Sequence, residues 1–227
     1  MKSIAIYVEG GGDTVEQRKE LRVGIDGLLR CQKQAAQAKF LRWKTVPSGG
    51  RQQTYEAFVH EVQHADDTAL CVLLVDSEDE LPGESSKQKG ATQEVMEQCL
   101  AADSQTRKSH LTKRDKWNLK RIPAENIHLM VRCMEAWIIA DPEALIRFYG
   151  SAFNAGKLPT SPDLENEVKS RLYAKLKDAT KPTSKGAYTK LKHASKLLGL
   201  IDRNKVAVRC PRFATFTHWL DKQIRNA

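Results

Sequence analysis

A nearly continuous apolar segment, ALCVLLVD at residues 69–76, limits the possible folds more than any other part of the chain. Such a run is typical of a central parallel strand that is covered on both faces. Three further strands are predicted at residues 3–8, 40–46 and 126–131, with helical patterns between them. Strands that alternate with helices predict an α/β fold with a mainly parallel central sheet, whose functional groups lie at the carboxyl ends of the strands.

The helical patterns divide the chain into two parts. The first predicted helix follows a glycine turn, where Thr14 and Gln17 fit a capping box. Further helices are expected near residues 53–65, 91–101 and 133–150, and the pattern is helical and basic from about residue 159 onward. We therefore expect an α/β domain at residues 1–158, with a basic helical extension at residues 159–227 packed on it.

The composition is that of an ordinary folded protein. The chain has 227 residues, of which 41% are hydrophobic and 29% charged, enough for one principal domain with an extension. No apolar run approaches the roughly 20 residues of a membrane helix, and the amino-terminal segment lacks a signal-peptide pattern. The five cysteines are widely spaced and form no CxxC pair, which argues against a disulfide framework or a cysteine zinc site. We expect a cytoplasmic protein with no membrane partner.

The net charge of +9 is unevenly distributed. Residues 1–100 carry 12 Lys and Arg against 16 Asp and Glu, a net charge of −4, whereas residues 101–227 carry 25 against 12, a net charge of +13. A metal-dependent enzyme that acts on a polyanion needs both parts, because acidic groups hold the cation and basic groups neutralise phosphates. A basic surface that only keeps the protein soluble is the alternative.

The first candidate site follows strand 3–8, where Glu9 precedes three glycines and Asp13. A carboxylate there lies at the mouth of the sheet, and Gly11 and Gly12 would let a phosphate approach the backbone and the next helix. A plain tight turn explains the same glycines. The segment is neither a Walker A loop nor a GxGxxG fingerprint, so neither standard mode of nucleotide binding is supported.

The second candidate site is the acidic run DSEDE that begins at Asp76, at the end of the most hydrophobic strand. Clustered carboxylates suit Mg²⁺ or Mn²⁺, although a solvated acidic loop is the alternative. Strands 3–8 and 69–76 are commonly neighbours in such a sheet, so Glu9 and Asp76 should converge. Glu135 follows the fourth strand and is expected to point toward the same mouth, as a metal ligand or as a neighbour of one.

These segments resemble the Toprim domain of topoisomerases, bacterial primases and overcoming-lysogenisation-defect nucleases. The resemblance implies that Glu9 serves as a general acid or base or as a metal ligand, and that Asp76 and Glu78 hold Mg²⁺. Glu78 stands where the second Asp of the family's Asp-x-Asp motif is usual. That departure keeps the charge but lengthens one ligand, so it leaves open whether one or two metals bind.

A closer resemblance is to a Toprim-like family of unassigned function, encoded beside AAA-type and overcoming-lysogenisation-defect-type ATPases in bacterial defence loci. The segments that carry it are VEGGGDT, PSGGRQQT, LLVDSEDE, HLMVRCMEAWIIADPEAL and GAYTKLKHA. The resemblance implies a nuclease effector of an anti-phage system that is licensed by an ATPase subunit. Any ATP dependence would have to come from that partner, because the chain has no ATP-binding loop of its own.

A competing motif is HExxH, formed by His60, Glu61 and His64, which is the signature of zinc metalloproteases. On a helix, the apolar residues of this segment gather on one face and both histidines fall on the opposite face. If the apolar face covers the sheet, the histidines lie in solvent, and a catalytic zinc also needs a third protein ligand and a closed cavity. A zinc metallopeptidase is therefore a further hypothesis, which predicts a bound zinc that is lost when His60 is mutated.

Two basic tracts are candidate nucleic-acid surfaces, although each is alternatively a solvated face. The tract at residues 107–121 surrounds Trp117, and the tract at residues 175–192 brackets Tyr188, so each offers a ring for stacking on an unpaired base. Arg51, after the second glycine turn, is placed to steady a scissile phosphate. The candidate binding residues in the tracts are Arg114, Lys116, Trp117, Lys185 and Lys190.

The leading hypothesis is a Mg²⁺-dependent nuclease that cleaves phosphodiester bonds of DNA or RNA. Asp76 and Glu78 would hold the metal, Glu9 would activate water or protonate the leaving group, and Arg51 would orient the phosphate. The alternative is a non-catalytic nucleic-acid-binding or regulatory subunit of an ATPase, in which the acidic mouth is a structural metal site. The sequence does not distinguish DNA from RNA as the substrate.

Overall fold

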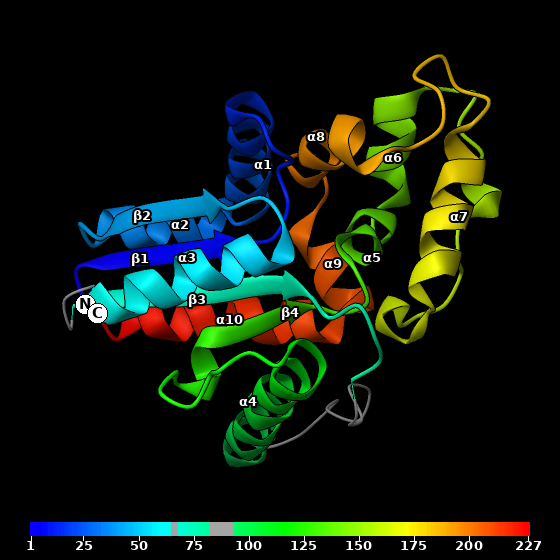
Figure 1. The fold of residues 1–227 in the computed structure, drawn as a ribbon. Helices are drawn as coiled ribbons and strands as arrows, with labels where there is room; N and C mark the ends of the chain where they lie inside the picture. The colour runs from blue at the N-terminus through cyan, green and yellow to red at the C-terminus, as the bar shows by residue number, and fades with distance from the viewer. Residues whose placement is uncertain (65–67, 82–92) are drawn as a thin grey trace.

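The computed structural model describes residues 1–64, 68–81 and 93–227, and for residues 93–102 the backbone alone. Four strands form one parallel sheet in the order β2-β1-β3-β4, with helices on both faces (Figure 1). The strands are β1 (Ser3–Val8), β2 (Arg42–Pro47), β3 (Ala69–Asp76) and β4 (Ile127–Met130). The predicted α/β fold with a parallel central sheet is confirmed, and it is consistent with a Toprim-like fold.

Helices occupy most of the rest of the described chain. They are α1 (Val15–Leu28), α2 (Arg30–Ala38), α3 (Arg51–His64), α4 (Gln93–Asp115), α5 (Met134–Ile139), α6 (Pro142–Tyr149), α7 (Lys169–Thr180), α8 (Ser195–Leu198), α9 (Arg203–Arg209) and α10 (Pro211–Arg225), with short 3₁₀ turns and a π-helical turn at Lys190–Ala194. Within the part of the chain that the structure describes, no helix combines the length and the hydrophobicity that a membrane span requires.

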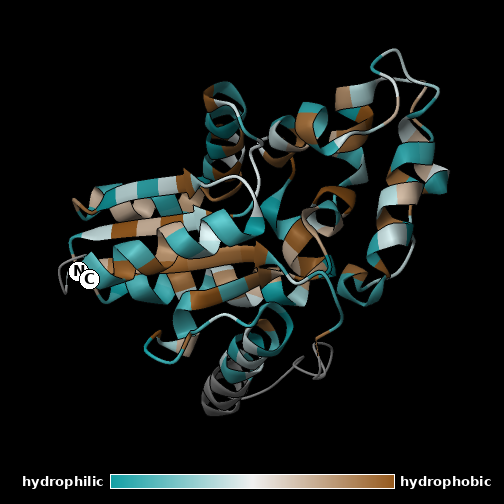
Figure 2. Ribbon diagram, in the orientation of Figure 1, coloured by the Kyte–Doolittle hydropathy of each residue, from teal (hydrophilic) through white to brown (hydrophobic). Residues whose placement is uncertain are grey.

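The sheet separates two hydrophobic layers. Alternate residues of β1 face opposite sides, because successive side chains of a strand point to opposite faces. Ile4 and Ile6 pack with α1, α2 and α10 on one side, whereas Ala5 and Tyr7 pack with α3 and the end of α4 on the other. The central strand β3 is buried on both faces and is hydrophobic along most of its length in Figure 2.

The carboxyl-terminal helices complete the main hydrophobic layer. Phe213, Phe216 and Leu220 of α10 are buried in the same cluster as residues of β1 and β3, and α10 contacts β4 and α2. Figure 1 shows α10 behind the sheet, with its end close to the amino terminus. Through α10, residues 159–227 therefore supply one wall of the core beneath the sheet.

Several local predictions are confirmed. The bounds of β1 and β3 match the predicted strands, because both are apolar runs with sharp polar ends. Thr14 caps α1, with both hydrogen bonds of the capping box to Gln17 present. From the sequence, Asp141 before Pro142 either ends one helix or caps the next; it caps α6, where its carboxylate accepts a hydrogen bond from the Ala144 amide.

Several element boundaries differ from the prediction, and the clearest differences are three. The second strand begins at Arg42 instead of residue 40, because α2 runs to Ala38 and Phe40, which is 94% exposed, takes a positive φ of 59° in the turn. The helical segment after the glycines is two helices, α1 and α2, separated at Leu29. The helix predicted near 91–101 continues to Asp115.

Candidate metal centre

Glu9 and Asp76 lie at the carboxyl ends of two neighbouring parallel strands. The chain leaves β1 toward β2 on one side, then crosses back over β1 to β3 on the other. Ligand sites of open α/β sheets form at such a reversal of strand order, outside the carboxyl ends of the strands. The side chain of Glu9 accepts a hydrogen bond of 3.1 Å from the Asp76 amide, so the predicted convergence of the two residues is confirmed.

Glu78 joins Glu9 and Asp76 in a group that could hold a metal ion. One carboxylate oxygen from each residue lies within 4.8 Å of the others. It is the only group of three or more such side chains among the residues that the structure describes. Asp76 is fully buried, whereas Glu9 and Glu78 are partly exposed, and three carboxylates are a donor set for a hard divalent cation. We refer to these three residues as the carboxylate trio.

The turn after β3 holds Glu78 in place. The backbone of Glu78 has a φ of 66°, which is uncommon for a residue with a side chain. A strained conformation of this kind persists only where the surrounding structure fixes it. The Glu78 amide donates to the Arg132 carbonyl at 3.1 Å, and the Ser77 amide donates to the Met130 carbonyl at 2.9 Å. The Ser77 hydroxyl accepts from the Arg132 amide at 2.7 Å, so the segment after β4 clamps the turn.

Each carboxylate of the trio contacts a cationic side chain. Glu9 pairs with Arg51 at 3.0 Å, Asp76 pairs with Lys190 at 2.9 Å, and Glu78 pairs with Lys169 at 2.6 Å. The second oxygen of Asp76 accepts a hydrogen bond of 3.0 Å from the amide of Met134 at the start of α5. Three negative charges at the sheet mouth are thus matched by three positive ones.

The environment raises the pKa of Glu9 and of Lys190, as it also raises the pKa of Arg51 and of Lys169. Burial raises the pKa of Glu9, and the charge of Asp76 raises it further, although Arg51 and Lys190 act in the opposite direction. Burial acts to lower the pKa of Lys190, but Asp76 and Glu135 outweigh it, so the pKa of this ammonium group lies well above its usual range. Lys190 therefore stays protonated, while Glu9 holds a proton more readily than an ordinary glutamate.

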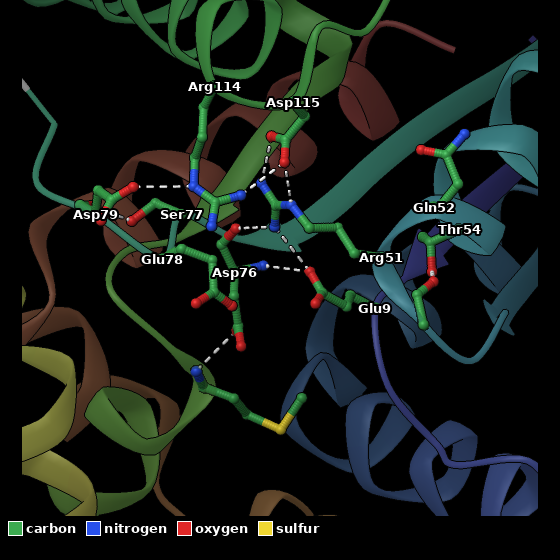
Figure 3. A network of polar contacts seen from close by, with 12 residues as sticks. Glu9, Arg51, Gln52, Thr54, Asp76, Ser77, Glu78, Asp79, Arg114 and Asp115 are labelled. Carbon is green, nitrogen blue, oxygen red and sulfur yellow. Dashed lines mark hydrogen bonds and ion pairs between the residues drawn. The ribbon is translucent and has the colours of Figure 1, made fainter.

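Arg51 is fixed by several acceptors at once. Its guanidinium group forms two hydrogen bonds of 2.8 Å to the carboxylate of Asp115, at the end of α4, besides its contacts with Glu9 and the Asp76 carbonyl (Figure 3). Arg114 pairs with Asp115 and with Asp79 in the same network. Arg51 therefore lies beside the trio as predicted, where it orients Glu9; its predicted contact with a phosphate remains a prediction.

The glycines after Glu9 form a tight turn. Gly10, Gly11 and Gly12 have φ values of 116°, 90° and 62°, and a side chain on Gly12 would lie 2.2 Å from the Gln17 amide oxygen. That oxygen accepts from the amides of Asp13 and Thr14 ahead of α1, which is capped by its own residues. The turn accounts for the glycines, and phosphate binding at Gly11 and Gly12 remains a prediction.

The prediction that Trp117 stacks on a nucleic-acid base is wrong for this structure. The ring is only 4% exposed and lies parallel to Tyr55, with ring centres 4.5 Å apart, and its nitrogen donates to Gln52. Arg107 of the same tract is also buried and bonds the Ile127 carbonyl and Asp103. Trp117 is amphipathic and packs under α3. Its position among basic residues in the sequence did not indicate this burial. The adjacent Lys116 is exposed.

In the second basic tract, too, the predicted stacking ring is buried within the protein. Tyr188 is buried, and its hydroxyl donates to the Glu135 carboxylate at 2.9 Å, so it is not available for stacking on a base. Glu135 lies outside the trio, but it faces Lys190 and thus neighbours the site. The Lys185 nitrogen lies over the ring of Phe148, 5.3 Å from the ring centre.

The HExxH motif lies on the outer face of α3. His60 and His64 are exposed and stack on each other with ring centres 4.3 Å apart, while Phe58 on the opposite face is buried against the sheet. Among the described residues, no third His, Cys, Asp or Glu joins them as a possible zinc ligand. The short connection from α3 to the next strand, which contains Asp66 and Asp67, lies outside the described residues. The predicted helix face is confirmed, because both histidines are exposed to solvent while the apolar face is buried.

Two residues of the site were missed at the level of sequence. Lys169 begins α7 and binds Glu78, and Asp115 ends α4 and anchors Arg51. Asp115 had a signal, because it is the single acid within the basic segment KRDK. Lys169 had none, since its position at the trio depends on how α7 packs beside α5.

Residues 8–221 match the family described as Domain of unknown function (DUF4276). The chain belongs to this family. No curated protein and no solved structure matches it significantly. In this DUF4276 chain the matched region runs from the end of β1 to α10, so it includes the whole trio and all three of its cationic partners. The relation to Toprim proteins and to defence loci remains a prediction.

Proposed function

We propose that the protein binds Mg²⁺ or Mn²⁺ through Glu9, Asp76 and Glu78 and cleaves phosphodiester bonds of DNA or RNA. The observation that supports this most directly is the convergence of three carboxylates within 4.8 Å at the reversal of strand order. Basic side chains surround them, as a site for a polyanion requires. The donor set is all oxygen, which suits these cations better than zinc.

The charge balance of the site favours an anionic substrate. The trio and its three cationic partners cancel, so a divalent cation would add two positive charges to this group, before the carboxylates of Asp115 beside Arg51 and of Glu135 beside Lys190 are counted. A phosphodiester brings a negative charge that offsets part of this added charge. The cation would supply electrostatic stabilisation of the charge that develops on the phosphate.

The residues of the chain have distinct roles in this proposal. Glu9, whose pKa is raised, accepts a proton from the attacking water or returns one to the leaving group. Arg51 orients Glu9 through their 3.0 Å contact, and Asp115 fixes Arg51 in turn. Asp76, anchored by the Met134 amide, and Glu78, held by the clamped turn, are the main cation ligands.

We further propose that an ATPase subunit licenses the activity. This proposal rests on the resemblance to proteins encoded beside ATPases and on the absence from the sequence of a Walker A loop. The alternative is a regulatory subunit in which the trio is a structural cation site. Copurification with an ATPase, without cleavage under any condition, would favour that alternative.

The test is cleavage of labelled plasmid, single-stranded DNA and tRNA by the purified protein in Mg²⁺, Mn²⁺ or EDTA. Glu9→Gln and Asp76→Asn are compared with Glu56→Gln and Asp178→Asn, which change exposed carboxylates elsewhere. We expect metal-dependent cleavage that both site variants lose and both control variants keep. An inactive wild-type protein is assayed again with the proposed ATPase subunit and ATP. Cleavage by Glu9→Gln at the wild-type rate contradicts the role assigned to Glu9.

Metal binding is measured separately by calorimetry with Mn²⁺. Asp76→Asn should weaken binding at least about tenfold, because it removes a charged ligand. Asp178→Asn should leave the affinity unchanged. Equal affinity in the wild type and Asp76→Asn would show that the trio is not the cation site.

A further inference from the structure

A cavity of about 620 Å³ opens beside the carboxylate trio. Cavities of this size accommodate small organic ligands. It lies where the start of α7 approaches α5 and the π-helical turn. Its lining residues are Glu135, Val168, Lys169, Ser170, Tyr173 and Lys190.

Two lysines join the cavity to the trio. Lys169 and Lys190 line the cavity, and their ammonium groups contact Glu78 at 2.6 Å and Asp76 at 2.9 Å. The Lys169 nitrogen also lies 3.9 Å from the same Asp76 oxygen, so the two ammonium groups converge on one carboxylate. A phosphate bound by these lysines would therefore lie between the trio and the cavity, and the rest of its nucleotide would extend into the cavity.

Tyr173 supplies an aromatic surface on the cavity wall. Its side chain is 38% exposed, and its ring meets Tyr188 edge to face with centres 5.7 Å apart, which limits its movement. Bases stack on such rings without regard to sequence, because every base has a π face. In a duplex both faces of a base are covered by its neighbours, so only an unpaired nucleotide could use this ring.

We propose that this cavity is a subsite for one unpaired nucleotide, with the phosphate at Lys169 and Lys190 and the base against Tyr173. The substrate is therefore single-stranded DNA or RNA, or a single-stranded region of a longer molecule. This inference rests on the proposed function, because it places the bound phosphate beside the trio. It differs from the predicted surface at Trp117, which is buried within the protein.

The test is a binding measurement that needs no cleavage. Fluorescence anisotropy is recorded with a labelled 12-nucleotide DNA strand, the same sequence as RNA, and the DNA duplex, each in EDTA and in Ca²⁺. The proteins are the full-length wild type, Tyr173→Leu, Tyr173→Phe and Lys169→Met. The matched controls are Phe40→Ala, which removes an exposed aromatic ring from the turn after α2, and Lys157→Met, which removes an exposed lysine outside both basic tracts and outside the cavity lining.

We expect the wild type to bind at least one single strand about tenfold more tightly than the duplex. Tyr173→Leu should weaken single-strand binding by about 5- to 100-fold, whereas Tyr173→Phe should retain it, because stacking needs the ring and not the hydroxyl. Lys169→Met should weaken binding of single strand and duplex alike, and both control variants should bind as the wild type does. Preference for DNA or for RNA identifies the strand type.

Two outcomes would overturn the subsite. One is equal affinity for single strand and duplex in the wild type, and the other is unchanged single-strand binding in Tyr173→Leu. Failure of the proposed function is distinguishable: single-strand binding that depends on Tyr173, without cleavage in Mg²⁺ or Mn²⁺, supports the subsite and contradicts the nuclease. Cleavage that is equally fast on duplex and on single strand, and indifferent to Tyr173→Leu, supports the nuclease and contradicts the subsite.

Discussion

Lys190 balances the charge of the trio through its contact with Asp76. Its ammonium group binds Asp76, which is fully buried, and it is held by a π-helical turn, a rare element that occurs often at functional sites. A lysine at this position neutralises the carboxylate when no metal is bound. It therefore competes with the cation that the trio is proposed to hold.

Lys190→Met should lower the free energy of unfolding in the absence of metal and increase the affinity for Mn²⁺. The loss should be about 1–3 kcal/mol, less than for a fully buried pair, because the lysine side chain is 37% exposed. Mn²⁺ should raise the melting temperature of this variant more than that of the wild type, because it replaces the missing charge. Thermal unfolding in EDTA and in Mn²⁺ tests this, with Lys192→Met as the control; an equal response of the two lysine variants contradicts it.

Glu165 gives the stability a dependence on pH. Burial raises its pKa to about 8, with Arg212 acting in the opposite direction, and one of its oxygens has no hydrogen-bond partner. Because the folded-state pKa lies above that of the unfolded chain, the neutral form favours the folded state. The stabilisation is complete below about pH 4.5 and is lost as the pH rises toward 8.

Glu165→Gln should flatten this dependence. Between pH 5 and 8 the free energy of unfolding of the wild type should fall relative to the variant, by at most about 1.4 kcal/mol per pH unit. Urea unfolding at pH 5, 6.5 and 8 measures the difference. Glu143→Gln, at an exposed position, should behave as the wild type. A constant difference between the wild type and Glu165→Gln across this range would be the contrary result.

Site residues were predicted best where a side chain of suitable chemistry directly follows a recognisable strand in the sequence. Glu9 and Asp76 are carboxylates directly after apolar strands, so both could be assigned to the mouth of the sheet. Trp117 was assigned incorrectly, because its burial depends on the packing of Tyr55 and Gln52 from α3. Lys169 could not be assigned, since no local pattern indicates which lysine of a basic segment reaches a distant carboxylate.

At the level of elements, the contact between α1 and α8 depends on glycine. A side chain on Gly24 would lie 2.2 Å from the Ser195 carbonyl oxygen, and one on Gly27 would lie 2.9 Å from the Gly199 backbone. The two helices approach each other closely because these positions have no Cβ. Since α8 continues directly from the turn that carries Lys190, the contact also positions this lysine at the trio.

Gly24→Ala should destabilise the protein by about 1–3 kcal/mol, because α8 must shift to admit the methyl group. The sign of the change in the free energy of unfolding is informative, because alanine in a helix interior is otherwise more favourable than glycine by about 0.5–1 kcal/mol. Urea unfolding measures the change, with Val23→Ala on the exposed face of the same helix as the control. Stabilisation by Gly24→Ala would show that the two helices are free to separate.

Strands were easier to predict from the sequence than the ends of helices. The apolar runs of β1 and β3 have polar residues at both ends, whereas β2 is preceded by Phe40 and Leu41, of which only Leu41 is buried. The division between α1 and α2 was not evident, since both helices carry good helix-forming residues up to and beyond Leu29. Tertiary contacts decided these boundaries.

At the scale of the whole molecule, the two predicted parts share one core. Helix α10 covers the sheet face formed by Ile4, Ile6 and Val72, so residues 159–227 supply a layer that the sheet requires. The sequence pattern indicated a basic helical extension packed on the α/β domain, but it did not show that α10 supplies a layer of the core of the sheet. That arrangement rests on contacts between residues far apart in the chain.

A fragment of residues 1–158 should therefore fail to unfold cooperatively. Removal of α10 exposes one face of the sheet, and the fragment should bind a hydrophobic dye and show little near-ultraviolet circular dichroism. Circular dichroism during urea titration, compared with the full chain, tests this. A sharp transition for the fragment would instead establish residues 1–158 as a separate domain.

The charged residues of the site are synthesised at different times, because they lie far apart in the sequence. The trio and Arg51 lie within the first 78 residues, but Lys169 and Lys190 belong to the last third of the chain. A nascent chain on the ribosome thus carries the acidic side chains long before two of their three counter-charges emerge. The site becomes electrically balanced only after residues 169 and 190 have been synthesised, so assembly of the centre requires that both of these segments have folded against the sheet domain.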